Sequence, residues 1–309
     1  MSEKKEKKIV NFMSARWIAT ALSVVLLLAS IGSLATKGIS FGLDFTGGTQ
    51  IEVAFEQPLP LTTIRDELST AGYDGAIVVH FGSERDVLVR LPKGYADTVG
   101  AEMVELLVEK SGQPVELRRI EFVGPQVGEE LREQGGLAML LALAVVMLYV
   151  AIRFQFKFSV GAVVALAHDV IIILGIFSFF QLDFDLTVLA ALLAVIGYSL
   201  NDTIVVSDRI RENFRKLRVS DPVKVINISL TETLGRTVIT SLTTALVLTA
   251  LFVFGGEMIH SFALALLIGV GVGTYSSIYV AANAMIMMGI SREDLIPQVS
   301  DDEELDARP

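Results

Sequence analysis

The chain has 309 residues, of which 52% are hydrophobic and only 19% are charged. Its formal net charge of −10 argues against a nucleic-acid-binding surface. Because it contains no cysteine, any domain outside the membrane must fold without disulfide bonds.

Six long apolar stretches predict membrane-spanning helices, since a helix needs about 20 mostly apolar residues to cross a bilayer. They run over 17–35, 136–152, 158–180, 186–207, 237–254 and 262–288. The chain is therefore expected to be a polytopic α-helical membrane protein with six transmembrane helices and both termini on the same side.

The distribution of lysine and arginine predicts the orientation of these helices. Basic residues gather before the first span, between the second and third, and between the fourth and fifth, whereas the loops at 181–185 and 255–261 have none. Short basic loops stay in the cytoplasm. We therefore expect a cytoplasmic segment at 1–16, a first transmembrane helix at 17–35, a periplasmic domain at 36–134, a five-helix transmembrane region at 135–290 and an acidic cytoplasmic tail at 291–309.

The periplasmic domain, between the first and second helices, is predicted from hydrophobic periodicity. Its expected elements are a strand at 49–55, a helix at 61–71, strands at 76–81 and 86–91, a helix at 97–110 and a strand at 115–123. This β-α-β-β-α-β order is typical of an α+β ferredoxin-like domain. The domain has no nucleophile elbow, phosphate loop or metal-spaced cluster, so we expect no enzyme activity, no metal and no cofactor.

Two segments next to the predicted spans carry weaker signals. The linker FGLDFTGGT at 41–49 contains paired glycines and predicts a turn without chemistry. The segment 222–234 is amphipathic, and we expect it to lie along the cytoplasmic membrane surface.

The pair Asn201 and Asp202 interrupts the fourth span and is the most informative feature of the sequence. A carboxylate inside a bilayer costs several kcal/mol, which marks it as an ion or proton site or as a polar contact between helices. In the fifth span Arg236, Thr240 and Thr244 share one helix face, and Arg236 is expected near the level of Asp202. An alternating Asp202–Arg236 pair and a static ion pair both remain open.

Two further polar or small-residue patterns lie in the other spans. His168 and Asp169 lie near the middle of the third span, where they can form a titrating pair or a structural hydrogen bond. Gly269 and Gly273 in the sixth span are four residues apart, a spacing that favours close helix packing.

Taken together, the sequence resembles the SecF members of the SecD/SecF family of bacterial protein-export membrane proteins. The resemblance rests on FGLDFTGGT at 41–49, RIEFVGPQVG at 119–128, ALAHDV at 165–170, IGYSLNDTIVVSDRIRENFRK at 196–216, GRTVITSLTT at 235–244 and IGVGVGTYSSIYVA at 268–281. These motifs follow one another over nearly the whole chain.

The resemblance implies an accessory subunit of the Sec protein translocase in the bacterial inner membrane. It implies SecD, the protein-conducting Sec channel, unfolded exported polypeptides and membrane lipid as partners, but no nucleic acid. It also implies kinship with resistance-nodulation-division transporters and use of the proton-motive force, with Asp202 and Arg236 tied to proton transport. The role of His168 and Asp169 stays open. Two alternatives remain, one half of a proton-coupled small-molecule exporter and a purely structural scaffold of the translocase.

Overall fold

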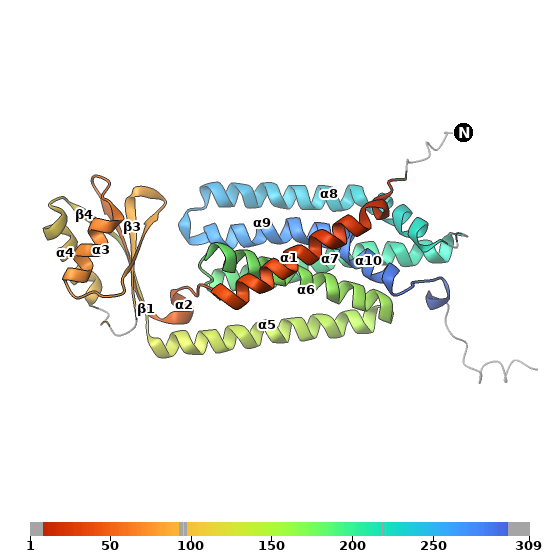
Figure 1. Cartoon of the computed structure of the whole chain (residues 1–309), viewed down its shortest axis with the longest axis horizontal. Helices are drawn as coiled ribbons and strands as arrows, with labels where there is room; N and C mark the ends of the chain where they lie inside the picture. The colour runs from red at the N-terminus through yellow and green to blue at the C-terminus, as the bar shows by residue number, and fades with distance from the viewer. Residues whose placement is uncertain (1–8, 93–94, 96–97, 218, 220, 296–309) are drawn as a thin grey trace, which may run out of the picture.

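The structure is a computed structural model that describes residues 9–92, 95, 98–217, 219 and 221–295. A small sheet domain stands at one end of a long helix bundle (Figure 1). Six helical segments are long and apolar enough to cross a membrane, as predicted. They are α1 (Arg16–Lys37, preceded by the short η1, Phe12–Ala15), α5 (Pro125–Arg153), α6 (Phe156–Phe180), α7 (Leu186–Lys216), α8 (Pro222–Phe254) and α9 with α10 (Glu257–Ile278, Val280–Met287).

The helices differ in how deeply they lie in the bundle. α6 and α7 are the most buried of the six segments, whereas α5 and α8 expose most of their apolar side chains. The sixth span consists of α9 and α10, which are divided at Tyr279, although hydrogen bonds from Tyr279 to Tyr275 and from Asn283 to Tyr279 continue across this residue. α7 packs most extensively against α9.

The sheet domain has the predicted β-α-β-β-α-β order, which confirms a ferredoxin-like fold. Its elements are β1 (Gly48–Phe55), α3 (Leu61–Thr70), β2 (Ile77–Phe81), β3 (Ser83–Leu91), α4 (Val99–Ser111) and β4 (Val115–Val123). The strands form an antiparallel sheet in the order β2-β3-β1-β4. The predicted helix at 97–110 corresponds to α4, which begins at Val99 and follows Thr98. Residue 97 lies outside the described residues.

The core of this domain follows from alternation along the strands. Ile51 and Val53 on β1 are fully buried and lie opposite Val89 and Val87 on β3. α3 and α4 cover this face with their own buried residues, which are Ile64, Leu68, Met103 and Leu107. A strand whose side chains alternate between two environments buries one face only, and the helices supply the other half of the core.

The linker before β1 attaches the domain to the helix bundle. It contains a short helix, α2 (Leu43–Thr46), whose Phe45 is buried against Phe177 and Phe184. The backbone N–H of Gly42 donates to the carbonyl of Phe184 at 2.8 Å, and the carboxylate of Asp44 accepts from the N–H at the start of α7 at 3.0 Å. The predicted turn is therefore also a docking element that touches the loop between α6 and α7.

The paired glycines of this linker are required by close backbone approaches. Gly47 and Gly48 have φ angles of +67° and +129°, which residues with a side chain rarely adopt. A Cβ atom at Gly48 would lie 2.5 Å from the carbonyl oxygen of Leu91 on β3. One at Gly47 would lie 3.0 Å from the Cα of Pro125, the first residue of α5.

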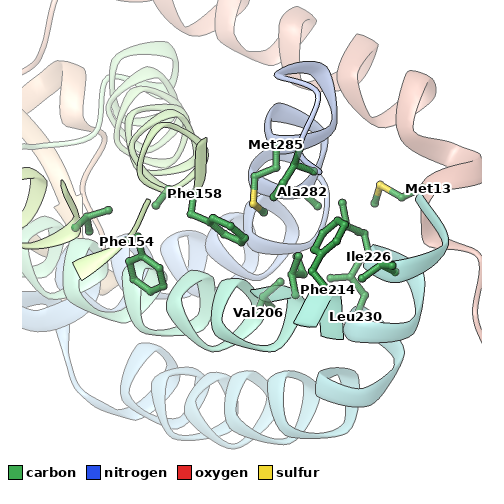
Figure 2. Close-up of a cluster of buried hydrophobic side chains, with 14 of the residues drawn as sticks. Met13, Phe154, Phe158, Val206, Phe214, Ile226, Leu230, Ala282 and Met285 are labelled. Carbon is green, nitrogen blue, oxygen red and sulfur yellow. The ribbon is translucent and has the colours of Figure 1, made fainter. Parts of the chain in front are cut away.

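The prediction of a surface helix at 222–234 is wrong. The segment is the first part of α8, and its apolar residues Val225, Ile226 and Leu230 are buried inside the protein. Figure 2 shows Ile226 and Leu230 gathered with Phe214 of α7 and with Met13 of η1. The segment is amphipathic as predicted, but protein covers its apolar face.

Gly269 and Gly273 lie on the side of α9 that meets α7. A Cβ atom at Gly269 would overlap the side chain of Val195, and one at Gly273 would lie 3.0 Å from the Cβ of Ser199. Small residues of this kind let two helices approach closely. The other face of α9 is different, because a Cβ atom at Gly271 would meet nothing within 4 Å.

The close approach at Gly48 generates a first prediction. Replacing Gly48 by alanine adds backbone strain of about 1–3 kcal/mol and an overlap of similar cost. We expect faster hydrogen–deuterium exchange in β1 and β3 of the full chain. Gly72→Ala is the matched control, because Gly72 also has a positive φ of +90° but has open space around it. Equal exchange in both variants would contradict the proposed role of the close approach.

The packing of α9 on α7 generates a second prediction. Gly269→Ala forces Val195 to move, at a cost of about 1–3 kcal/mol, whereas Gly271→Ala adds a methyl group in open space. We expect Gly269→Ala to lower the melting temperature of the detergent-solubilised chain by several degrees relative to Gly271→Ala. A lower melting temperature for Gly271→Ala instead would place the close contact on the wrong face.

Candidate functional site

Asp202 on α7 is held by hydroxyl groups from two neighbouring helices. Its Oδ1 accepts a hydrogen bond from Thr237 of α8 at 2.7 Å, and its Oδ2 accepts one from Ser277 of α9 at 2.6 Å. The three helices therefore meet at this carboxylate. Because both partners are neutral, they satisfy the hydrogen-bonding capacity of the carboxylate without neutralising its charge.

Asp169 on α6 forms a second and more deeply buried centre. The residue is fully buried, and its Oδ2 accepts from Ser199 of α7 at 2.5 Å and from Ser276 of α9 at 2.8 Å. Its Oδ1 lies 3.0 Å from Nδ1 of His168. The structure therefore brings the predicted His168–Asp169 pair together and surrounds it with hydroxyl groups.

The two carboxylates are connected through adjacent residues of α9. Ser276 donates to Asp169, and the next residue, Ser277, donates to Asp202. Both serines lie in the last turn of α9, directly before the break at Tyr279. A shift of this turn therefore changes the surroundings of both carboxylates at once.

A further chain of hydrogen bonds leads from His168 to α1. Nε2 of His168 lies 3.2 Å from Oγ of Ser23, which lies 2.9 Å from the hydroxyl of Tyr275. Tyr275 in turn donates to the backbone carbonyl of Ala19 at 2.7 Å. Residues of α6, α9 and α1 are thus joined through one continuous set of contacts.

Arg236 is not paired with Asp202, although both residues lie in the described part of the chain. It is exposed and lines a cavity of about 730 Å³ beside α7 and α8, together with charged residues that include Arg211 and Glu232. The next residue of α8, Thr237, contacts Asp202 instead. Asn201 is also exposed, and its side chain makes no hydrogen bond within the described residues.

The face of α8 that meets the site differs from the one expected. The sequence places Arg236, Thr240 and Thr244 on one face, but Thr240 donates to carbonyls of its own helix. Thr237 and Ser241 face the site instead, and Ser241 contacts Thr274 at 2.7 Å. Because consecutive helical residues are about 100° apart, an error of one position moves the contact to another face.

The hydroxyl partners Ser199, Thr237, Ser276 and Ser277 were not predicted as site residues. Ser199 lies three positions before Asp202, and Ser276 and Ser277 follow the glycine run of the sixth span. A hydroxyl in an apolar helix is too common to identify as a carboxylate partner from the sequence. Among the described residues, no group of three or more His, Cys, Asp or Glu side chains is placed to hold a metal ion.

Comparison with known proteins gives the family context of this site. The model of the C-terminal region of the protein export membrane proteins SecD and SecF matches residues 103–291, and that of the SecD/SecF GG motif matches residues 32–59. The GG motif covers the linker with Gly47 and Gly48. The C-terminal match contains every side chain that contacts Asp169 or Asp202.

Curated relatives match along nearly their full length. The protein translocase subunit SecF of Pseudomonas aeruginosa is 53% identical over 97% of this chain and 98% of the relative. That of Escherichia coli O157:H7 is 45% identical over 97% of this chain and 94% of the relative.

A solved structure supports the same assignment. The crystal structure of SecDF from Thermus thermophilus, described as a translocon-associated membrane protein, superposes with a TM-score of 0.84 at 39% identity. The match covers 91% of this chain but only 39% of the SecDF chain, which is much longer. A second structure, SecDF in a super-membrane-facing form, superposes with a TM-score of 0.68. The chain therefore belongs to the SecD/SecF family of protein-export membrane proteins.

Proposed function

We propose that this chain is the SecF-type subunit of the Sec translocase and that it uses a proton gradient to promote the export of polypeptides. The observation that carries the first part is the match over nearly the full length of curated SecF subunits. The observation that carries the second part is the Asp202 carboxylate, which is half-buried between α7, α8 and α9 and, among the described residues, accepts hydrogen bonds from the neutral hydroxyl groups of Thr237 and Ser277.

A SecD-type protein is the partner that the similarity to SecDF and to curated SecF subunits supports. The chain matches 39% of the SecDF chain of T. thermophilus, and we propose that a SecD-type region corresponds to the part that it does not match. α5 and α8 each expose a long apolar surface. Such a surface allows association with the helices of a partner in the membrane. The protein-conducting channel and the unfolded exported polypeptide complete the set of partners.

Asp202 is the proposed proton carrier. Burial in a medium of low dielectric constant disfavours a charged carboxylate, whereas an approaching cation favours it. Arg236 and Thr237 are consecutive residues of α8, so a rotation of α8 by about 100° would exchange the hydroxyl for the guanidinium at Asp202. Such an exchange would release a proton, and the reverse motion would allow another to bind.

A line of polar groups on α7 supports proton access from the side that holds Arg236. The hydroxyls of Thr203 and Ser207 and the Nε of Arg211 are buried without a hydrogen-bond partner among the described residues. They follow one another at intervals of four residues and therefore share a helix face. Arg211 also lines the cavity beside α7 and α8, which links this face to the surface.

The proposed location is the bacterial inner membrane, with both termini in the cytoplasm and the ferredoxin-like domain in the periplasm. The support is the concentration of basic residues at one end of the bundle, where α7 ends with Arg215 and Lys216. The sheet domain stands at the opposite end (Figure 1). Parts of the proposed cytoplasmic segments, 1–8 and 296–309, lie outside the described residues.

A purely structural role in the translocase is the alternative that Asp202 can test. In that case the carboxylate would serve only to join α7, α8 and α9 through its hydrogen bonds. An asparagine at this position keeps the size and most of the hydrogen-bonding capacity but cannot cycle between charged and neutral forms.

We expect Asp202→Asn to abolish the gradient-dependent stimulation of export and to leave gradient-independent export and folding unchanged. The measurement is export of a reporter into inverted membrane vesicles that contain the variant as the only SecF-type subunit, with and without a proton gradient. Asp74→Asn is the control, because Asp74 is an exposed carboxylate of the sheet domain that accepts a hydrogen bond from Ser69 at 3.1 Å, far from the proposed proton path.

The same export measurement with a variant of Arg236 tests the proposed partner of Asp202. Arg236→Lys should retain part of the stimulation, because a positive charge remains but the planar guanidinium is lost. Equal stimulation in Asp202→Asn and in the wild type would leave Asp202 with a structural role only.

The orientation is tested with single cysteines, which is straightforward in a chain that has none of its own. Ser83 lies in the sheet domain and Ser14 in η1, and both residues are exposed. In intact spheroplasts a membrane-impermeant maleimide should label Ser83→Cys and should label Ser14→Cys only after lysis. The opposite pattern would reverse the proposed orientation.

A further inference from the structure

We propose that His168 and Asp169 form a second proton-binding site, which is occupied in this conformation and whose occupancy holds α1 against α9. The inference deepens the proposed proton coupling, but it rests on hydrogen-bond geometry at a different carboxylate. Its test is therefore independent of export.

The direction of each hydrogen bond in the chain from α1 to His168 follows from the groups involved. The carbonyl of Ala19 can only accept, so Tyr275 must donate its single hydroxyl hydrogen to it, at 2.7 Å. The oxygen of Tyr275 then accepts from Ser23, at 2.9 Å. Since Ser23 has only one hydrogen to donate, it accepts from Nε2 of His168, at 3.2 Å. Nε2 therefore carries a hydrogen.

This assignment requires another proton between His168 and Asp169. A neutral imidazole with a hydrogen on Nε2 has a bare Nδ1, which can only accept. An ionised carboxylate also only accepts, so the two atoms would have no reason to lie 3.0 Å apart. The contact contains a proton, either as imidazolium with carboxylate or as neutral imidazole with carboxylic acid. Both forms leave the buried pair with no net charge.

Loss of this proton reverses the whole chain of hydrogen bonds. The remaining imidazole hydrogen moves to Nδ1 and is donated to Asp169, so Nε2 becomes an acceptor. Ser23 then donates to Nε2, and Tyr275 donates to Ser23. The oxygens of Tyr275 and Ala19 are left facing each other without a hydrogen, and their contact of 2.7 Å becomes repulsive. Deprotonation therefore removes a bond between α9 and α1.

The other side chains that α1 buries against the bundle are small, and Lys37 at its end donates to the carbonyl of Phe179 at 2.9 Å. The buried residues of α1 are Ala19, Ser23, Ser30 and Ser33. Ser30 lies where a side chain at Gly175 of α6 would be, and Ser33 contacts Ser178 at 2.9 Å. A helix held by so little apolar area depends on its hydrogen bonds for its position. α1 continues into the linker before β1, so its displacement would reach the ferredoxin-like domain.

No other charged side chain of the packed helices contacts the His168–Asp169 pair among the described residues. Tyr279 stacks beside Tyr275 with 5.5 Å between the ring centres, and Asp202 is bound by Ser277 rather than by Ser276. The charged residues of α1 are Arg16 and Lys37 at its two ends. A cavity of about 340 Å³ lies beside His168, between α1, α6 and α10, and gives α1 space to move.

The first experiment measures the imidazole tautomer directly. The full-length chain is labelled with ¹⁵N-histidine in lipid nanodiscs and titrated with pH, and His168→Asn identifies the signal among the three histidines. We expect a hydrogen on Nε2 at low pH and a change to Nδ1 only at higher pH. The same protonation pattern at every pH, whichever nitrogen carries the hydrogen, would overturn the proposal.

The second experiment measures the position of α1. Thr20 of α1 and Asn283 of α10 are joined by a hydrogen bond of 2.7 Å, so cysteines at both positions should cross-link when α1 is docked. The pair Asn213→Cys and Ser229→Cys is the reference, because pH also changes the reactivity of thiols and this pair, 3.0 Å apart in its native hydrogen bond, joins α7 to α8 without involving α1. Relative to this reference, cross-linking should fall several-fold as pH rises.

Single substitutions distinguish the proposed cause from a structural effect. Asp169→Asn cannot lose the proton but can donate to Nδ1, so cross-linking should stay high at every pH. Tyr275→Phe lacks the donor to Ala19 and should give low cross-linking at every pH, whereas Tyr279→Phe should behave like the wild type. Unchanged pH dependence in Asp169→Asn would overturn the proposal.

Failure of this inference can be told apart from failure of the proposed function. Asp202→Asn should leave the tautomer change of His168 intact. If that variant retains gradient-driven export while His168 still changes tautomer, the role of Asp202 fails and the second proton site stands. If gradient-driven export needs Asp202 but His168 keeps one protonation pattern at every pH, the second proton site is refuted.

Discussion

The arrangement of the helices depends on the need to satisfy two carboxylates inside an apolar bundle. Asp169 and Asp202 together receive hydrogen bonds from residues of α7, α8 and α9. Hydroxyl side chains are short, so these helices must approach closely before the bonds can form. Gly269 and Gly273 make that approach possible on the face of α9 that meets α7. The hydrogen bonds to the carboxylates and the small residues of α9 thus both depend on the close approach of the helices.

A second set of polar contacts fixes the ferredoxin-like domain on the bundle. Arg90 of β3 binds Asp183 in the loop between α6 and α7 at 2.8 Å, and the linker contacts the same loop through Gly42. The loop therefore touches both the sheet and the linker. Because α6 carries Asp169 and α7 carries Asp202, the domain is attached to the two helices that hold the proposed proton sites.

The sequence allowed the architecture to be predicted but not the partners within the site. Long apolar stretches and strict alternation, as at 49–55, depend on one environment per face and are readable without the structure. The sequence predicted Arg236 beside Asp202, whereas the structure has the next residue, Thr237, at this position. Periodicity cannot decide which face of a uniformly apolar helix turns inward. The segment 222–234 shows a related limit, because an amphipathic pattern does not say whether lipid or protein covers the apolar face.

The break of the sixth span at Tyr279 connects these features. Ser276 and Ser277 bind different carboxylates and lie in the last turn of α9, where the helix ends and α10 begins. Tyr275, one residue before them, holds α1. The backbone hydrogen bonds of Tyr279 to Tyr275 and of Asn283 to Tyr279 still join α9 to α10, so a shift of this turn would also reach α10. The proposed protonation of either carboxylate would therefore act on a segment of α9 that is attached to the other carboxylate and to α1.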